Sequence, residues 1–140
     1  MQEIFLDTNI VIDYLTNREP FSKMALRLFS LAENNKVRLN ISAISFTIIY
    51  YVLRKNNSPE SIIESLVSLS GICNVMPVNQ TIIDQALRSD FKDFEDAVQY
   101  YSASQNKNCS AIISRNKKDF QSSEIKVMLP DEFLRINELL

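Results

Sequence analysis

The N-terminal stretch constrains the fold more than any other part of this chain. An apolar run at residues 4–6 is followed by Asp7-Thr8-Asn9 and then by apolar residues at helical spacing through Leu15. A short strand that ends in an acid and turns directly into a helix is typical of a parallel sheet, whose polar site lies at the carboxyl ends of its strands. Asp7 is therefore either a candidate site residue or only the N-cap of the next helix.

The rest of the chain alternates apolar runs with amphipathic segments. The runs that predict strands lie at 37–41, 73–78, 109–114 and 125–128. The segments that predict helices lie at 20–34, 42–53, 58–71, 79–87 and 130–139. One more predicted helix begins within 89–98 and ends near 105. This alternation predicts an α/β fold, a three-layer α/β/α sandwich around a mostly parallel sheet of four or five strands.

Local signals predict several helix ends. Pro20 is placed as the first residue of its helix, and Ser42 and Ser58 are placed as N-caps. Gly71 is expected to end the helix that Ser58 begins.

The composition fits one compact domain, residues 1–140, because 46% of the 140 residues are apolar. No apolar run approaches the roughly 20 residues of a membrane span, and the N-terminus lacks the layout of a signal peptide. We therefore expect a cytoplasmic protein without membrane contact. The two cysteines, Cys73 and Cys109, lie in apolar runs and are expected to be buried free thiols.

The residue types that are missing narrow the chemistry. Without His the chain has no Ser-His-Asp or Cys-His site, and a single Gly excludes the phosphate-binding Gly-rich loops. Carboxylates, hydroxyls, amides and basic side chains remain, which favours a hard metal held by carboxylates. The net charge of −2 argues against broad nucleic-acid binding but leaves room for a local basic patch.

Carboxylates converge on the predicted edge of the sheet. Asp7 follows the first strand, and Asn116 and Asp119 follow the strand at 109–114. Asp93 and Asp96 open the helix that leads into that strand, and their spacing places them on one helical face. Asp93 also fits the first position of a capping box.

The apolar neighbours of Asp96 draw its carboxylate inward, where it needs a partner. Several carboxylates cannot all stay ionised there without a cation, so we expect Mg²⁺ or Mn²⁺. Thr8, Asn9, Ser114 and Asn116 are candidates for orienting the ligands.

The chain resembles the PIN domain family, particularly the VapC-like ribonuclease toxins. The resemblance lies in residues 6–9, 94–97, 112–120 and 129–134, and it covers essentially the whole chain in order. It implies a toxin ribonuclease, paired with an antitoxin protein, whose acids bind one or two divalent metals and activate water against an RNA phosphodiester. By matching motif, Asp7 and Asp96 are the principal ligands, Asp119 or Asn116 completes the set, and Asn9 supports it. The catalytic acids are then Asp7, Asp96 and Asp119.

One departure from the family stands in the segment 42–53. Members with a full acidic set carry a Glu there, whereas this chain has Ile48. Asp93 is a candidate replacement ligand. The alternative is a catalytically degenerate PIN-like module that binds RNA or protein.

Basic residues near the predicted site offer contacts to the substrate. Arg115, Lys117 and Lys118 can approach an RNA backbone, although solvated surface charges have the same pattern. The apolar helices at 20–34 and 43–53 can bury a homodimer face or pack within the chain.

Overall fold

The computed structural model describes residues 1–138 and contains one five-stranded parallel sheet. The strands are β1 (Gln2–Leu6), β2 (Val37–Ser42), β3 (Asn74–Met76), β4 (Cys109–Ile113) and β5 (Val127–Met128). Their spatial order is β3-β2-β1-β4-β5, and every neighbouring pair is parallel. The predicted α/β/α sandwich is confirmed, with β1 at the middle of the sheet.

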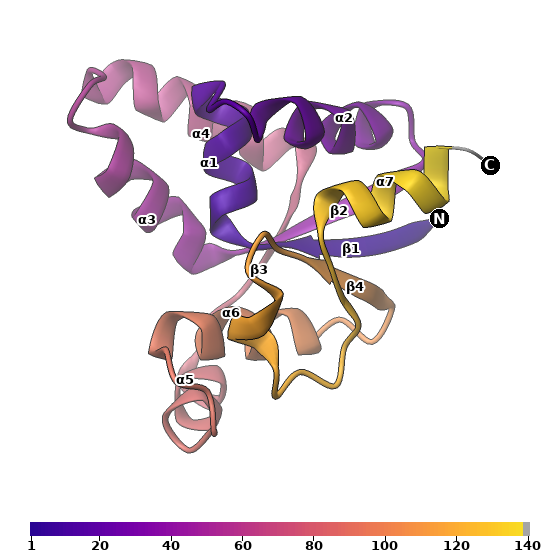
Figure 1. Ribbon diagram of the computed structural model, residues 1–140. Helices are drawn as coiled ribbons and strands as arrows, with labels where there is room; N and C mark the ends of the chain where they lie inside the picture. The colour runs from indigo at the N-terminus through magenta and orange to yellow at the C-terminus, as the bar shows by residue number, and fades with distance from the viewer. Residues whose placement is uncertain (139–140) are drawn as a thin grey trace.

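Helices cover both faces of this sheet, as Figure 1 shows. One layer holds α1 (Thr8–Thr16), α2 (Ser22–Glu33), α3 (Ala43–Leu53), α4 (Pro59–Ile72) and α7 (Pro130–Glu138). The other layer holds α5 (Gln80–Leu87), α6 (Phe94–Ser104) and the short 3-10 helix η1 (Lys117–Phe120). In the first layer, α3 and α4 form a hairpin that reaches beyond the end of α1.

Side chains of β1 alternate between two apolar cores. Ile4 and Leu6 are fully buried in the core shared with α1, α2 and α7, whereas Phe5 lies in the core on the α6 side. This is the period-two alternation that a strand buried on both faces must have. β1 is therefore held rigidly from both sides, and the residue that follows it has a well-defined position.

Two of the four predicted helix ends are confirmed. Ser42 accepts a hydrogen bond from the N–H of Ile44, and Ser58 accepts one from the N–H of Ser61. Two predictions are wrong: Pro20 precedes α2, which begins at Ser22, and Gly71 lies inside α4. The predicted end of the last helix at 139 lies outside the described residues.

The carboxyl ends of the central strands meet where the site was predicted. The N–H of Asp7 donates to the carbonyl of Ile113 at 3.0 Å, which ties the end of β1 to the end of β4. Both cysteines are free thiols, as predicted, but only Cys73 is buried, and Cys109 is half-buried. Within the part of the chain that the structure describes, none of the helices is long and apolar enough to cross a membrane.

Candidate active site

Asp7 is a buried carboxylate rather than a helix cap. It occupies the N-cap position of α1, but its side chain makes no capping hydrogen bond. Instead it accepts a hydrogen bond of 2.8 Å from the hydroxyl of Ser114, which itself accepts the N–H of Asn116. Burial raises the pKa of Asp7, the Ser114 hydrogen bond opposes that rise, and the charge of Asp119 adds to it.

Asp96 is half-buried in the first turn of α6 and titrates far from the usual range of a carboxyl. Burial, followed by the charges of Asp93, Asp7 and Asp119, raises its pKa to about 7. Carboxylates that are distant in the sequence therefore repel one another in the folded chain. This repulsion raises the pKa of Asp96, as expected if acids from three segments converge.

The structure gives Asp93 the capping role that the sequence left open. Asp93 lies outside α6, at its N-cap, and accepts the N–H of Asp96 at 3.2 Å. Asp93 therefore precedes α6 rather than lying within it, but its carboxylate and that of Asp96 lie beside the same cleft. Asp93 as a metal ligand remains a prediction.

Sequence reasoning missed Glu95. Burial and the charges of Asp7 and Asp93 raise the pKa of Glu95, so its carboxylate faces the same acids. The only sequence signal was its place in the acidic entry to α6, and that signal did not distinguish it from an ordinary first-turn acid.

A cleft of about 390 Å³ lies beside Asp96, and neither Asp7 nor Glu95 is among the residues that line it. Asp96, Asp119 and Lys118 line it together with Asp93, and we call it the acidic cleft. Its remaining lining residues are Asp90, Phe91, Lys92, Gln121 and Ser122. Lys118 is thus the predicted basic residue that the structure places beside the acids.

The other two predicted substrate-binding residues have partners inside the protein. Lys117 forms an ion pair of 3.1 Å with Glu132 on α7. The guanidinium of Arg115 forms two hydrogen bonds with the carboxylate of Asp13, at 2.8 and 3.3 Å, and lies over the ring of Phe21.

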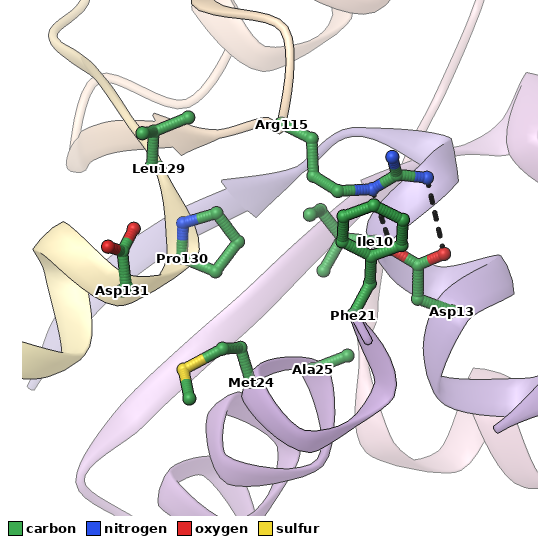
Figure 2. Close-up of a pocket in the computed structure, with 9 residues that line it drawn as sticks. All are labelled: Ile10, Asp13, Phe21, Met24, Ala25, Arg115, Leu129, Pro130 and Asp131. Atoms are coloured by element: carbon green, nitrogen blue, oxygen red, sulfur yellow. Dashed lines mark hydrogen bonds and ion pairs between the residues drawn. The ribbon is translucent and has the colours of Figure 1, made fainter. Parts of the chain in front are cut away.

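Figure 2 shows this Arg115 contact at the wall of a separate pocket of about 350 Å³. Its other walls are apolar side chains of α1, α2 and the start of α7, and Asp131 lies at its edge. The acids of the acidic cleft do not line this pocket. Asp13, which is 1% exposed, was not predicted from the sequence.

The hydroxyl of Thr8 is buried beneath the site. It lies 2.7 Å from the hydroxyl of Ser45 on α3, and it accepts a hydrogen bond from the Gln99 amide on α6. Asn9 lies half-buried in the first turn of α1. Ser45 and Gln99 were not predicted as site residues.

The donor chemistry of the site fits a hard divalent cation, because Asp7 and the carboxylates of the acidic cleft raise one another's pKa. Among the described residues, no three Cys, Asp or Glu side chains are arranged as a ready-made metal cage. Mg²⁺ does not need such a cage, since it is usually held by one or two carboxylates together with water and substrate oxygens.

Comparisons with known proteins agree with this geometry. Residues 3–118 match the family model of the PIN domain. The chain is 28% identical over 137 residues to Ribonuclease VapC1 of Aquifex aeolicus, covering 94% of this chain and 93% of that protein.

Solved structures have the same fold. A toxin-antitoxin complex from Klebsiella pneumoniae matches with a TM-score of 0.68 and 25% identity, over 91% of this chain and 97% of that one. VapBC-1 of nontypeable Haemophilus influenzae matches with a TM-score of 0.66 and 23% identity, over 93% and 99%. With its family model spanning most of the sequence, and its acids gathered where parallel strands end, this chain belongs to the PIN domain family.

Proposed function

We propose that the protein is a metal-dependent endoribonuclease and the toxin of a toxin-antitoxin pair. The observation that carries the proposal is Asp96, whose pKa is raised to about 7 by burial and by carboxylates from three segments of the chain. Perturbed acids gathered in a cleft are typical of catalytic sites. The similarity to a VapC ribonuclease over nearly the full length supports the same activity.

Asp7 and Asp96 would hold the divalent cation, with Asp119 or Asn116 completing the set from the loop after β4. The cation would supply positive charge at the scissile phosphate and acidify a water molecule. Mg²⁺ and Mn²⁺ both suit these oxygen donors.

The chain's own groups have separate roles around that cation. Ser114 donates to one oxygen of the Asp7 carboxylate and so holds the orientation of that side chain. Lys118 lies on the wall of the acidic cleft and would bind a phosphate of the RNA backbone. Thr8 and Asn9 lie in the first turn of α1 and support the position of Asp7.

Two kinds of protein partner belong to this proposal. The solved relatives include toxin-antitoxin complexes, which supports an antitoxin as the first partner. A homodimer is the second, and light scattering of the purified chain measures it directly. Cytoplasmic activity on RNA follows from the same proposal.

Cleavage of a generic single-stranded RNA tests the function. We expect cleavage with Mn²⁺, none after EDTA treatment, and recovery when Mn²⁺ is added back. Asp7→Asn should lower the rate by about a thousandfold, because it weakens the main anchor of the cation. Asp84→Asn, on the exposed face of α5, is the matched control and should leave the rate unchanged.

A binding module without catalysis is the second candidate, and Ile48 favours it because it stands where the family usually carries an acid. The assay separates the two. If antitoxin-free protein neither binds Mn²⁺ nor cleaves RNA, the ribonuclease proposal fails and the binding module replaces it.

A further inference from the structure

Three buried polar side chains join α1, α3 and α6. Gln99 of α6 donates to the hydroxyl of Thr8 in α1, and that hydroxyl lies 2.7 Å from the hydroxyl of Ser45 in α3. Gln99 and Ser45 are fully buried, and Thr8 is 2% exposed. We call these three residues the Thr8 bridge.

Two residues of the Thr8 bridge lie close in sequence to the two principal acids, Asp7 and Asp96. Thr8 follows Asp7 in sequence, and Gln99 lies three residues after Asp96, on the same face of α6. The Gln99 side chain also faces the Glu95 carboxylate and lowers its pKa. Any shift of α6 relative to α1 therefore changes the bridge and the separation of the two acids together.

Ser45, the third residue of the Thr8 bridge, lies on α3, the helix in which Ile48 replaces the acid that the family usually carries. Ser45 precedes Ile48 by three residues, so the two share a face of α3. A carboxylate at position 48 would help fix the site through a shared cation, and Ile48 cannot do so. The Ser45 hydroxyl gives α3 a fixed polar contact to the Asp7 segment in place of that acid.

Gln99 remains in the interior despite a cost. Its Oε1 atom is buried and has no hydrogen-bond partner among the described residues. A buried acceptor without a donor is unfavourable, and an apolar side chain of similar size would avoid the penalty. A benefit to the site, rather than to packing, accounts for an amide here.

We propose that Gln99 is a positioning residue of the ribonuclease site, which acts through Thr8 and Ser45 to hold Asp7 and Asp96 at the separation that a divalent cation requires. The inference rests on the proposed function. On this proposal the Thr8 bridge aligns α1, α3 and α6, a role that an acid on α3 would otherwise have through the shared cation.

The full-length Gln99→Met variant tests this role through binding of Mn²⁺, measured from the electron paramagnetic resonance of free Mn²⁺. We expect the dissociation constant for Mn²⁺ to rise 10- to 100-fold and kcat for RNA cleavage to fall by a similar factor. The metal-free variant should melt cooperatively near the wild-type temperature, because Met fills the space of Gln and removes the orphaned acceptor.

Ser102→Ala is the matched control. Ser102 is also fully buried on α6, but its hydroxyl contacts the carbonyl of Pro77 at 3.5 Å. This variant should bind Mn²⁺ as the wild type does. Thr8→Val, which keeps the shape of Thr8 and removes its hydroxyl, replaces Gln99→Met if the latter does not fold.

The outcomes distinguish the two proposals. Wild-type Mn²⁺ affinity in both Gln99→Met and Thr8→Val overturns the positioning role and leaves the ribonuclease intact. A loss of affinity that occurs only together with loss of the cooperative melting transition in both variants also overturns it. A wild type that neither binds Mn²⁺ nor cleaves RNA overturns the proposed function, and the positioning role with it.

Discussion

At pH 8, Asp96→Asn should raise the melting temperature of the metal-free protein by about 5 °C and lower RNA cleavage by about a thousandfold. The two effects have one cause. Asp96 is held among other carboxylates, and this arrangement destabilises the fold while it prepares the site for a cation.

The sign follows from the pKa of Asp96, which is about 7 in the folded chain against an ordinary value of 3.8. Between these values the folded chain keeps a proton that the unfolded chain releases, so stability falls as pH rises from about 4 to 7 and stays low above that. Because Asp96 is half-exposed, solvent screening reduces the effect to about 1–2 kcal/mol.

Thermal melts at pH 4 and pH 8, with and without Mn²⁺, measure this effect. The variant should gain stability over the wild type at pH 8 and little at pH 4. Mn²⁺ should stabilise only the wild type, since a ligand stabilises the state that binds it. An Asn variant that is less stable than the wild type at pH 8 contradicts the argument.

The fold was predictable from the sequence where the signals are local. Apolar runs and helical periodicity located all five strands, and Ser42 and Ser58 act within their own turns, so neighbouring residues suffice to identify them. The prediction that Gly71 ends its helix was wrong because packing also determines where a helix ends. Buried Leu69 holds the last turn of α4 against the core. A Cβ atom at position 71 would meet nothing within 4 Å, so this Gly is not there to relieve crowding at that atom.

The site was predictable only as far as topology determines it. Parallel strands bring their carboxyl ends together, which was enough to group Asp7 with Asp119, and Asp96 joined them because it opens the helix that leads into β4. The Thr8 contacts to Ser45 and Gln99 depend on how three helices pack, 37 and 91 residues apart in sequence. No local pattern marks such a contact, and Gln99 in particular resembles an ordinary polar residue of an amphipathic helix.

The ion pair of Asp13 and Arg115 is another long-range contact that no local sequence pattern marks. Its loss should have a large effect on the stability of the fold. Asp13 is 1% exposed and Arg115 is 102 residues away in sequence, yet their charges are joined by two hydrogen bonds. Arg18 lies farther off, 3.8 Å from the same carboxylate, with its side chain 44% exposed. Asp13 therefore depends mainly on Arg115 for charge compensation.

We expect Arg115→Met to destabilise the fold by about 3 kcal/mol, because it leaves the Asp13 carboxylate buried without its main partner. Burial already raises the pKa of Asp13, and the loss of Arg115 raises it further. The variant should therefore lose more stability at pH 8 than at pH 4, near the ordinary pKa of a carboxyl, because protonation at the lower pH removes part of the uncompensated charge. Urea unfolding at the two pH values measures the difference.

Two further variants, a control and a rescue, test whether buried charge causes the loss of stability in Arg115→Met. Arg135→Met removes an exposed ion pair with Asp131, 3.5 Å long, and should cost under about 0.5 kcal/mol. Asp13→Asn in the Arg115→Met background should recover part of the loss, since a neutral amide needs no counter-charge. A loss in Arg115→Met no larger than that in Arg135→Met contradicts a structural role. In that case, salt-dependent RNA binding by the same variant tests the substrate contact predicted for Arg115 from the sequence.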